Sequence, residues 1–190
     1  MNLQKNQELE LYIDGISTDG YGIGRVEQPD GRKMAVFVPF TAVGDTILCR
    51  IVKVQKTYAF GKMMRLITPS ADRVTAVDCP AFGKCGGCAF RHVSYAAEQR
   101  YKQQRVQDAM TRIAGWDGTV QPIVSCAAPD RYRNKAQYPV TAGENGPCAG
   151  FYAVHSHRVI EQDDCLLQPA VFSLLVETVL AWARENGVAP

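Results

Sequence analysis

The chain has 190 residues, enough for one or two domains, and 46% of them are hydrophobic, which permits a buried core. The formal net charge is +2, so the overall charge neither indicates nor excludes a nucleic-acid partner. No apolar run is long enough to cross a bilayer, and the polar start, residues 1–6, lacks the apolar core of a signal peptide. These features predict a cytoplasmic protein with no membrane partner.

The charges are unevenly distributed along the chain. Residues 50–112 carry 12 Lys and Arg against 4 Asp and Glu, a local balance of +8, whereas residues 1–49 and 113–190 each have a balance of −3. A basic region between acidic segments is typical of a surface that binds polyanions. An ordinary solvated lysine-rich surface has the same composition, so this feature alone leaves both interpretations open.

Residues 8–67 predict a series of short strands. Polar and apolar side chains alternate in residues 8–13, as they do in a half-buried strand. Further strands are expected at 18–25, 35–39, 45–54 and 58–67. Five short, curled strands favour a small barrel of the OB type, a scaffold that often binds oligonucleotides.

The second predicted strand contains glycines at positions 20, 22 and 24, and superficially resembles a GxGxxG nucleotide-binding loop. That loop needs a helix directly after it, whereas here a turn follows at residues 28–31. Glycine within a strand instead indicates sharp curvature or the close approach of another part of the backbone.

Cations and aromatic side chains are interleaved near the end of the predicted barrel. They are Lys53, Lys56, Tyr58, Phe60 and Arg65. Single-stranded nucleic acid is bound by cations, which neutralise phosphates, and by rings on which bases stack. We therefore expect these five side chains to contact nucleic acid.

Three cysteines, Cys79, Cys85 and Cys88, follow the barrel in a C-x5-C-x2-C arrangement. The two glycines between the last two let the backbone curl, so that both sulfur atoms can point at one centre. Three thiolates form an incomplete tetrahedral set, and soft thiolate ligands select an iron–sulfur cluster or zinc. A thioredoxin-like redox pair is the alternative, but it requires C-x-x-C at a helix N-terminus after a strand, and these flanks are Gly and Pro.

The remaining cysteines give weaker signals. The total of 7 is odd, and thiols are normally reduced in the cytoplasm, so a disulfide framework is not expected. Cys49 falls in a predicted strand as a small buried hydrophobe, and Cys126 and Cys148 are interpreted as structural. By composition, Cys165 is no better a ligand than Cys126 or Cys148.

Two helices are expected. Ser94 caps one that runs from about 95 to 114 and ends at Gly115, with Val106, Met110 and Ile113 facing a core. The second runs from about Pro169 to residue 186. The apolar stripe of this second helix consists of Val171, Leu174, Leu175, Val179 and Trp182.

Residues 120–161 predict further strands. A dense polar cluster, Arg131, Arg133, Asn134 and Lys135, precedes one of them. These side chains either contact phosphates and a base or form an ordinary strand surface, and the residues alone leave both interpretations open.

The chain resembles the N-terminal part of an iron–sulfur RNA (uracil-5-)methyltransferase of the 23S rRNA type, over essentially its whole length. The matching motifs are residues 20–25 and 36–45, which are similar to a TRAM domain, the C-x5-C-G-G-C loop followed by His92, and the segments 132–135, 150–152 and 156–165. Arg91 stands where the family usually has Gln, a difference that leaves the cysteines and His92 in place.

This resemblance implies a mainly β fold with some α: an OB-like TRAM domain at 1–70, an iron–sulfur loop at 71–93 and a central α+β domain at 94–190. It also implies that Cys165 joins Cys79, Cys85 and Cys88 as the ligands of a [4Fe–4S] cluster whose role is architectural. The cluster of residues 131–135 is then expected to help hold the RNA.

The resemblance further implies that a C-terminal domain with the S-adenosylmethionine site is missing, so that the 190 residues are a fragment, inactive alone and without a catalytic residue. The full enzyme is expected to be a monomer that methylates C5 of uridine in 23S rRNA. In this family a cysteine thiolate adds to C6 of uracil and thereby activates C5.

Two other functions are weighed against this one. A non-enzymatic nucleic-acid-binding protein with a four-cysteine zinc site would also use a C-x2-C pair. A radical or methylthiolating enzyme combines a TRAM domain with iron–sulfur chemistry, but it uses a C-x3-C-x2-C loop, and the five-residue spacing between Cys79 and Cys85 argues against it.

Overall fold

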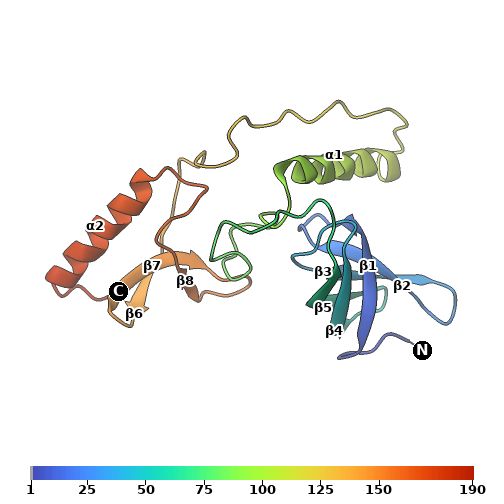
Figure 1. Ribbon diagram of the computed structural model, residues 1–190, viewed down its shortest axis with the longest axis horizontal. Coiled ribbons are helices and arrows are strands. Elements are labelled where there is room, and N and C mark those ends of the chain that lie inside the picture. The colour runs from blue at the N-terminus through green and yellow to red at the C-terminus, as the bar shows by residue number, and fades with distance from the viewer. Residues whose placement is uncertain (1) are drawn as a thin grey trace. The chain divides into compact units, whose positions relative to one another are not determined.

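The computed structural model describes residues 2–190, which form two compact units (Figure 1). The first unit contains the residues up to Ala76 together with Ala89–Ser125. The second contains Val77–Cys88 together with Cys126–Pro190. Each unit is a set of residues that contact one another, and such a set is not the same as a domain. The expected division of the chain into domains at residues 70 and 93 therefore stays a prediction.

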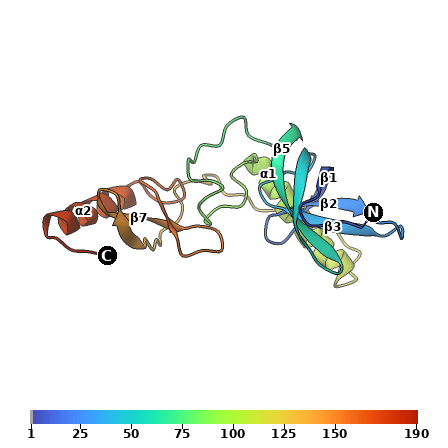
Figure 2. The ribbon, with the colours of Figure 1, turned by 90° about the horizontal axis from the view of Figure 1, so that it is seen from below.

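The first unit is built on five strands that close into a barrel in the order β1-β2-β3-β5-β4, which confirms the predicted five-stranded barrel (Figures 1 and 2). The strands are β1 (Glu8–Ile16), β2 (Gly22–Glu27), β3 (Lys33–Val38), β4 (Thr46–Val54) and β5 (Tyr58–Thr68). All pairs are antiparallel except β3 with β5, which run parallel and close the barrel.

Every second side chain along the strands points into the barrel and fills its interior. Ile13, Val36, Ile47 and Ile51 are fully buried there, as the period of two in their strands requires. The glycines of β2 let neighbouring chain come close: a Cβ built on Gly24 would lie 2.5 Å from the Leu11 Cγ and 2.7 Å from the Tyr12 carbonyl oxygen. The expectation of a close backbone approach is therefore correct.

A buried ion pair joins the start of β4 to the chain that leaves the barrel. The Asp45 side chain is fully buried, and the Arg73 side chain is 15% exposed. Arg73 Nε and Nη2 donate to the two carboxylate oxygens of Asp45 at 2.8 and 2.7 Å. The same carboxylate accepts the backbone N–H groups of Ala42 at 2.6 Å and Ser70 at 2.9 Å, so this buried charge is fully hydrogen-bonded.

Helix α1 (Tyr95–Arg112) begins as predicted, because the Ser94 hydroxyl accepts the Ala97 N–H at 3.2 Å as an N-cap. It belongs to the barrel unit. The Tyr101 hydroxyl donates to Asp72 at 2.8 Å and accepts the Val43 N–H at 3.2 Å. The helix is therefore attached through Ala97 and Tyr101 near its N-terminus, and further along through Arg105, whose Nη1 donates to the Thr18 carbonyl at 3.2 Å.

The face of α1 expected to meet a core was predicted wrongly. Val106, Met110 and Ile113 are 50%, 37% and 87% exposed. The one fully buried side chain among the described residues of α1 is Ala97, which packs with Phe90 and Tyr101. The helical spacing located an apolar stripe, but a different and more polar face contacts the rest of the unit.

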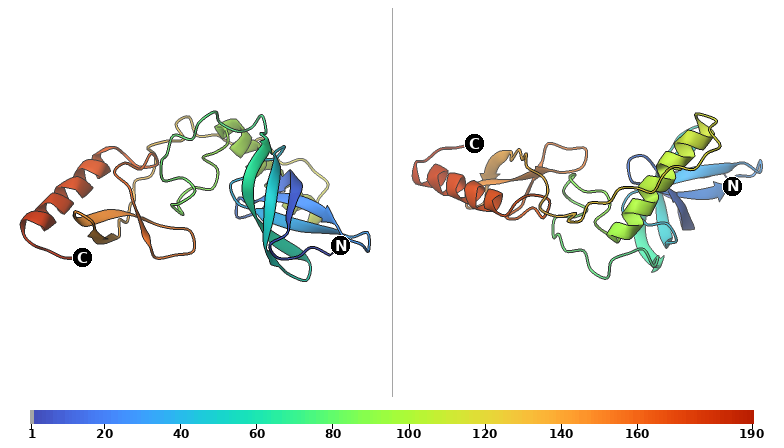
Figure 3. Two further views of the ribbon diagram at one scale, coloured as in Figure 1. Left: turned by 60° about the horizontal axis from the view of Figure 1, so that its bottom comes forward. Right: turned by 90° about the horizontal axis from the view of Figure 1, so that it is seen from above.

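The second unit contains a three-stranded antiparallel sheet of β6 (Val140–Gly143), β7 (Gly146–Tyr152) and β8 (Val159–Glu161), and helix α2 (Val171–Glu185) (Figure 3). The strands expected before residue 140 do not form: residues 120–139 are irregular. Pro122, Pro129 and Pro139 interrupt this stretch and each lacks a backbone donor for a strand ladder.

Helix α2 is close to its predicted bounds. Its apolar stripe is more than half exposed in the described structure: Val171 52%, Leu174 61%, Leu175 56%, Val179 59% and Trp182 56%. The residues that the structure describes include no helix both apolar and long enough to cross a bilayer.

Replacing Asp45 by Ala should destabilise the barrel by about 3–5 kcal/mol, because Arg73 then keeps a buried charge without its partner. Hydrogen exchange followed by mass spectrometry on peptides of β1 and β4 measures this locally. Glu8→Ala is the matched control, since the Glu8–Arg50 pair is 39% and 45% exposed and should contribute less than about 1 kcal/mol. Equal protection in the two variants would contradict the structural role of Asp45.

Candidate metal centre and nucleic-acid surface

The cysteine loop is folded by turns of its own backbone. The N–H groups of Lys84 and Cys85 donate to the Ala81 carbonyl at 3.0 and 2.8 Å, and the Phe82 N–H donates to the Cys79 carbonyl at 3.1 Å. Gly83 sits between them at φ +81°, a backbone conformation that suits glycine. These turns place the first two cysteines of the motif on one compact loop.

The loop is attached to the end of β7 within the second unit. The Gly86 N–H donates to the Tyr152 carbonyl at 2.9 Å, and Cys85 forms a bridge with Ala153. A Cβ on Gly86 would lie 3.3 Å from the Tyr152 carbonyl oxygen and 3.4 Å from the Val154 nitrogen. Glycine at position 86 therefore permits this close backbone contact as well as the curl between the cysteines.

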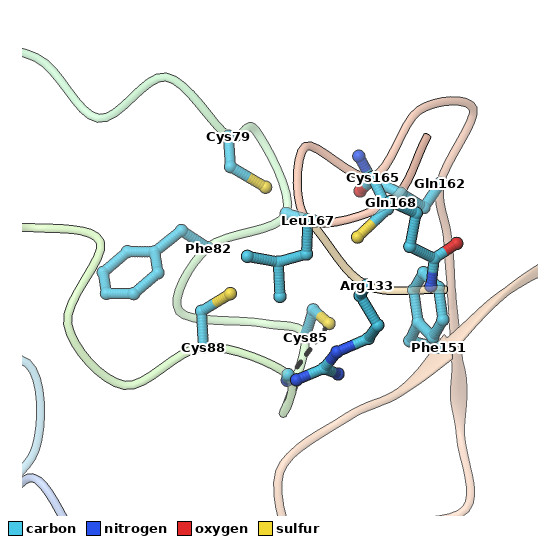
Figure 4. Close-up of a pocket in the computed structure, with 12 residues that line it drawn as sticks. Cys79, Phe82, Cys85, Cys88, Arg133, Phe151, Gln162, Cys165, Leu167 and Gln168 are labelled. Atoms are coloured by element: carbon cyan, nitrogen blue, oxygen red, sulfur yellow. Dashed lines mark hydrogen bonds between the residues drawn. The ribbon is translucent and has the colours of Figure 1, made fainter. Parts of the chain in front are cut away.

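Four cysteines line one pocket of the second unit: Cys79, Cys85 and Cys88 from the loop and Cys165 from the segment after β8 (Figure 4). In Figure 4 the sulfur atoms of Cys79, Cys88 and Cys165 point toward the middle of the pocket. Each of the four residues is partly buried and none is in a disulfide. The structure thus brings Cys165 together with cysteines that lie 77 to 86 positions before it in the sequence.

The surroundings of the four thiols are mostly apolar. Phe82, Phe151 and Leu167 line the same pocket, whose space, including the part open to solvent, is about 470 Å³. Burial raises the pKa of the Cys85 thiol; the Gly87 N–H, 3.3 Å from the Cys85 sulfur, lowers it, and the charges of Cys165 and Cys79 raise it. Thiolates gathered here therefore repel one another unless a cation neutralises them.

A four-thiol donor set in an apolar pocket fits an iron–sulfur cluster or zinc, the partners that soft sulfur ligands select. As they stand, no three His, Cys, Asp or Glu side chains within residues 2–190 are arranged to hold a metal ion. The assignment of the four cysteines as ligands of a [4Fe–4S] cluster therefore stays a prediction.

The other candidate ligands lie elsewhere. Cys49 is fully buried in the barrel core, Cys148 is buried in β7, and Cys126 is exposed. His92 belongs to the barrel unit with 3% of its surface exposed, and burial lowers its pKa.

Three aromatic rings gather on the outer face of the barrel. Phe37, Tyr58 and Phe60 contact one another with ring centroids 5.6 to 5.9 Å apart. They lie on β3 and β5, where Phe37 is paired with Phe60, while the intervening Ala59 and Val36 point into the core. Phe37 was missed at the sequence level, because its meeting with Phe60 depends on the parallel pairing of two strands that are not consecutive.

Exposed cations lie on β5, which carries two of these rings, on the neighbouring β4 and on the turn between them. Lys53 is directly opposite Phe60 in the β4–β5 pairing, and Lys62 follows on the outward face of β5. Lys56 lies in the turn between the two strands, and Arg65 lies further along β5. The arrangement combines rings and cations as a single-stranded nucleic-acid surface does, and its contact with RNA stays a prediction.

The four residues of the predicted polar cluster, 131 and 133–135, have different surroundings in the structure. Arg131 forms an ion pair with Asp164, and Arg133 lines the cysteine pocket. Asn134 and Lys135 are exposed. Contact of these four residues with RNA also stays a prediction.

Comparison with known proteins identifies the barrel and the relatives of the whole chain. Residues 2–64 match the TRAM domain family. An uncharacterized RNA methyltransferase of Halalkalibacterium halodurans is 42% identical over 187 residues, which cover 98% of this chain and 40% of that protein. Similarly named proteins of Clostridium tetani and Synechocystis are 35% and 36% identical, and the match covers 98% and 97% of this chain and 39% of each.

This chain is therefore homologous to proteins named RNA methyltransferases and spans about 40% of their length. The crystal structure of Pyrococcus abyssi tRNA (uracil-54, C5)-methyltransferase in complex with S-adenosyl-L-homocysteine has a TM-score of 0.60. The match covers 93% of this chain and 37% of that one at 21% sequence identity, which shows a shared fold alone.

The cysteines of the metal-free chain should differ widely in alkylation rate. Cys126 is exposed, whereas burial raises the pKa of Cys49 to about 11, so that about one Cys49 thiol in a thousand is ionised at pH 8. Iodoacetamide labelling at pH 8 with peptide mass spectrometry should modify Cys126 first, Cys85 more slowly and Cys49 last. Unfolding in denaturant should remove these differences; equal rates in the native chain would contradict the described burial.

Proposed function

We propose that this chain is the RNA-recognition and [4Fe–4S]-binding part of an S-adenosylmethionine-dependent enzyme that methylates C5 of uridine in 23S rRNA. The observation that carries the proposal is the convergence of Cys79, Cys85, Cys88 and Cys165 on one pocket, in a chain whose barrel matches the TRAM family. Four thiols on one mostly apolar pocket are the donor set that an iron–sulfur cluster uses.

The methylation itself rests on the relatives. They are named RNA methyltransferases, and this chain covers about 40% of their length. We assign the S-adenosylmethionine site, the nucleophile and the general base to the part of such proteins that this chain does not match. No residue of this chain is assigned a catalytic role.

The proposed work of these residues is to bind and orient RNA. Uracil inside a stacked helix cannot reach an active site, and taking it out costs roughly a few kcal/mol. The cations Lys53, Lys56 and Arg65 can hold phosphates, and the Phe37, Tyr58 and Phe60 rings can stack with unpaired bases, which offsets that cost. When bound, the cluster supplies a rigid cross-link between loop 79–88 and the segment of Cys165.

Ribosomal RNA is proposed as the substrate on the resemblance of the cysteine and TRAM motifs. The structural neighbour from Pyrococcus abyssi acts on tRNA by its name, so tRNA is the natural competitor in any substrate test. Binding of 23S rRNA segments and of tRNA transcripts, compared at one salt concentration, decides between them.

A second function follows from the same donor set. Four cysteines also suit a structural zinc ion, and the chain would then be a nucleic-acid-binding protein without enzymatic activity. The two functions differ in metal content, because an iron–sulfur protein absorbs broadly in the visible range and a zinc protein is colourless.

Cys165→Ala should abolish retention of iron and sulfide, because the site then keeps three of its four thiolate ligands. Cys126→Ala, which removes an exposed cysteine outside the pocket, should leave both unchanged. Iron and acid-labile sulfide per chain, measured after anaerobic reconstitution, provide the comparison. A Cys165→Ala protein with full iron content would rule out Cys165 as a ligand.

Tyr58→Ala should weaken binding of single-stranded RNA by about 1–3 kcal/mol, the usual loss when a base loses its stacking partner. Tyr12→Ala is the matched control, because Tyr12 is a 58% exposed aromatic residue of β1 outside the aromatic cluster. Fluorescence anisotropy with a labelled oligonucleotide measures both affinities. Equal losses in the two variants would remove the aromatic cluster from the proposed RNA surface.

The same binding should weaken steeply with salt, since the proposed polar contacts are to phosphates. Each phosphate contact contributes a slope of about −0.7 to the dependence of log K on log salt for a single strand. Contacts from Lys53, Lys56 and Arg65 therefore predict a slope near −2. A flat dependence between about 50 and 200 mM salt would contradict the basic surface.

A further inference from the structure

The side chain of Arg131 hydrogen-bonds to the segment that carries Cys165. Its Nη1 and Nη2 donate to the two carboxylate oxygens of Asp164, each at 2.6 Å. Nη1 also lies 3.0 Å from the Gln168 carbonyl and 3.4 Å from the Cys165 carbonyl. One guanidinium thus reaches acceptors on both sides of the cysteine.

The backbones of the two segments are joined as well. The Arg131 N–H donates to the Leu166 carbonyl at 2.8 Å, and the Arg133 N–H donates to the Leu167 carbonyl at 2.9 Å. Arg131 has a φ of +59°, which is uncommon for a residue other than glycine and persists where the surrounding contacts fix it.

The Cys165 segment has little other regular support. Residues 162–170 form neither helix nor strand and lie between β8 and α2. The Gln168 N–H donates to the Cys165 carbonyl at 2.9 Å, which closes a turn, and the Ser173 hydroxyl donates to Asp164 at 3.1 Å. Arg131 supplies most of the bonds that tie this turn to a different part of the chain; the Arg133 N–H and the Tyr138 hydroxyl, which donates to the Gln168 side chain, supply the others.

We infer that Arg131 is a positioning residue: with Asp164, it fixes where the Cys165 thiol enters the four-cysteine pocket. This inference rests on the proposed cluster, and it gives Arg131 a role different from the RNA contact expected for it as part of residues 131–135.

The contact between Arg131 and Asp164 contributes by fixing a geometry rather than by charge attraction. The Arg131 and Asp164 side chains are 37% and 44% exposed, and an ion pair that exposed adds little stability by charge attraction alone. The planar fork of arginine, however, makes two parallel bonds to a carboxylate and has further donors for carbonyl oxygens. Lysine keeps the charge but cannot reproduce that set of bonds, so it separates the two contributions.

Arg131→Lys and Asp164→Asn are the test variants, since both are close in size to the native residues. Arg158→Lys is the matched control, because Arg158 is an exposed arginine of the same unit that does not line the pocket. After anaerobic reconstitution, iron and sulfide per chain and the rate at which visible absorbance fades in air are measured for each. Far-UV circular dichroism confirms that the variants are folded.

We expect the visible absorbance of Arg131→Lys to fade about 10-fold faster or more than that of the wild type, as for other residues that orient a metal ligand. Asp164→Asn should have a similar effect, and the double variant should be no worse than either single one, because the two residues act as a pair. RNA affinity, measured on the same samples, should stay unchanged in Arg131→Lys, which keeps the positive charge.

The outcomes separate this inference from the function on which it rests. A wild-type chain that binds no iron overturns both. A wild-type chain with its full cluster, together with an Arg131→Lys variant of equal iron content and equal lifetime in air, overturns the positioning role alone. If Arg131→Lys loses RNA affinity while its cluster is unchanged, the positioning role is also overturned, and Arg131 is instead an RNA-contacting residue.

Discussion

The candidate site depends on the meeting, in one pocket, of three thiols from one short loop with a fourth from far along the chain. The loop at 77–88 groups with residues 126–190 rather than with the barrel that precedes it or the helix that follows it. The Gly86 bond to the Tyr152 carbonyl fixes the loop on β7, and the contacts of Arg131 fix the turn of Cys165. Both attachments use backbone groups, so the sulfur atoms are brought together by the fold of the whole unit.

The barrel meets a different constraint, that of presenting aromatic rings to water without losing its core. Strict alternation along β3 and β5 solves it: Val36 and Ala59 are fully buried, while Phe37, Tyr58 and Phe60 pack against one another outside. Exposed rings can stack with unpaired bases, and neighbouring lysines can neutralise phosphates. The proposed RNA surface therefore follows from strand pairing, and the cysteine pocket from loop attachment.

Local patterns predicted local structure well. The five strands, the Ser94 cap of α1 and the approximate bounds of α2 follow from alternation, capping and helical spacing. What failed depended on tertiary contacts. The spacing of Val106 and Met110 indicates an apolar stripe, but nothing in it shows which face of α1 meets the barrel, and the small side chain of Ala97 was the one that packed. Cys165 resembles Cys126 and Cys148 in composition, so residue patterns alone do not single it out; the family resemblance named it, and in the structure it lines the same pocket as the loop cysteines.

The proposed function depends above all on whether the four-cysteine pocket binds an iron–sulfur cluster. It is tested most directly by purifying the unaltered chain without oxygen and measuring iron, acid-labile sulfide and zinc together with the visible spectrum. We expect a brown protein with about four irons and four sulfides per chain, the composition of one [4Fe–4S] cluster held by four thiolates. A colourless protein with about one zinc per chain would contradict it and would leave a nucleic-acid-binding zinc protein as the better description.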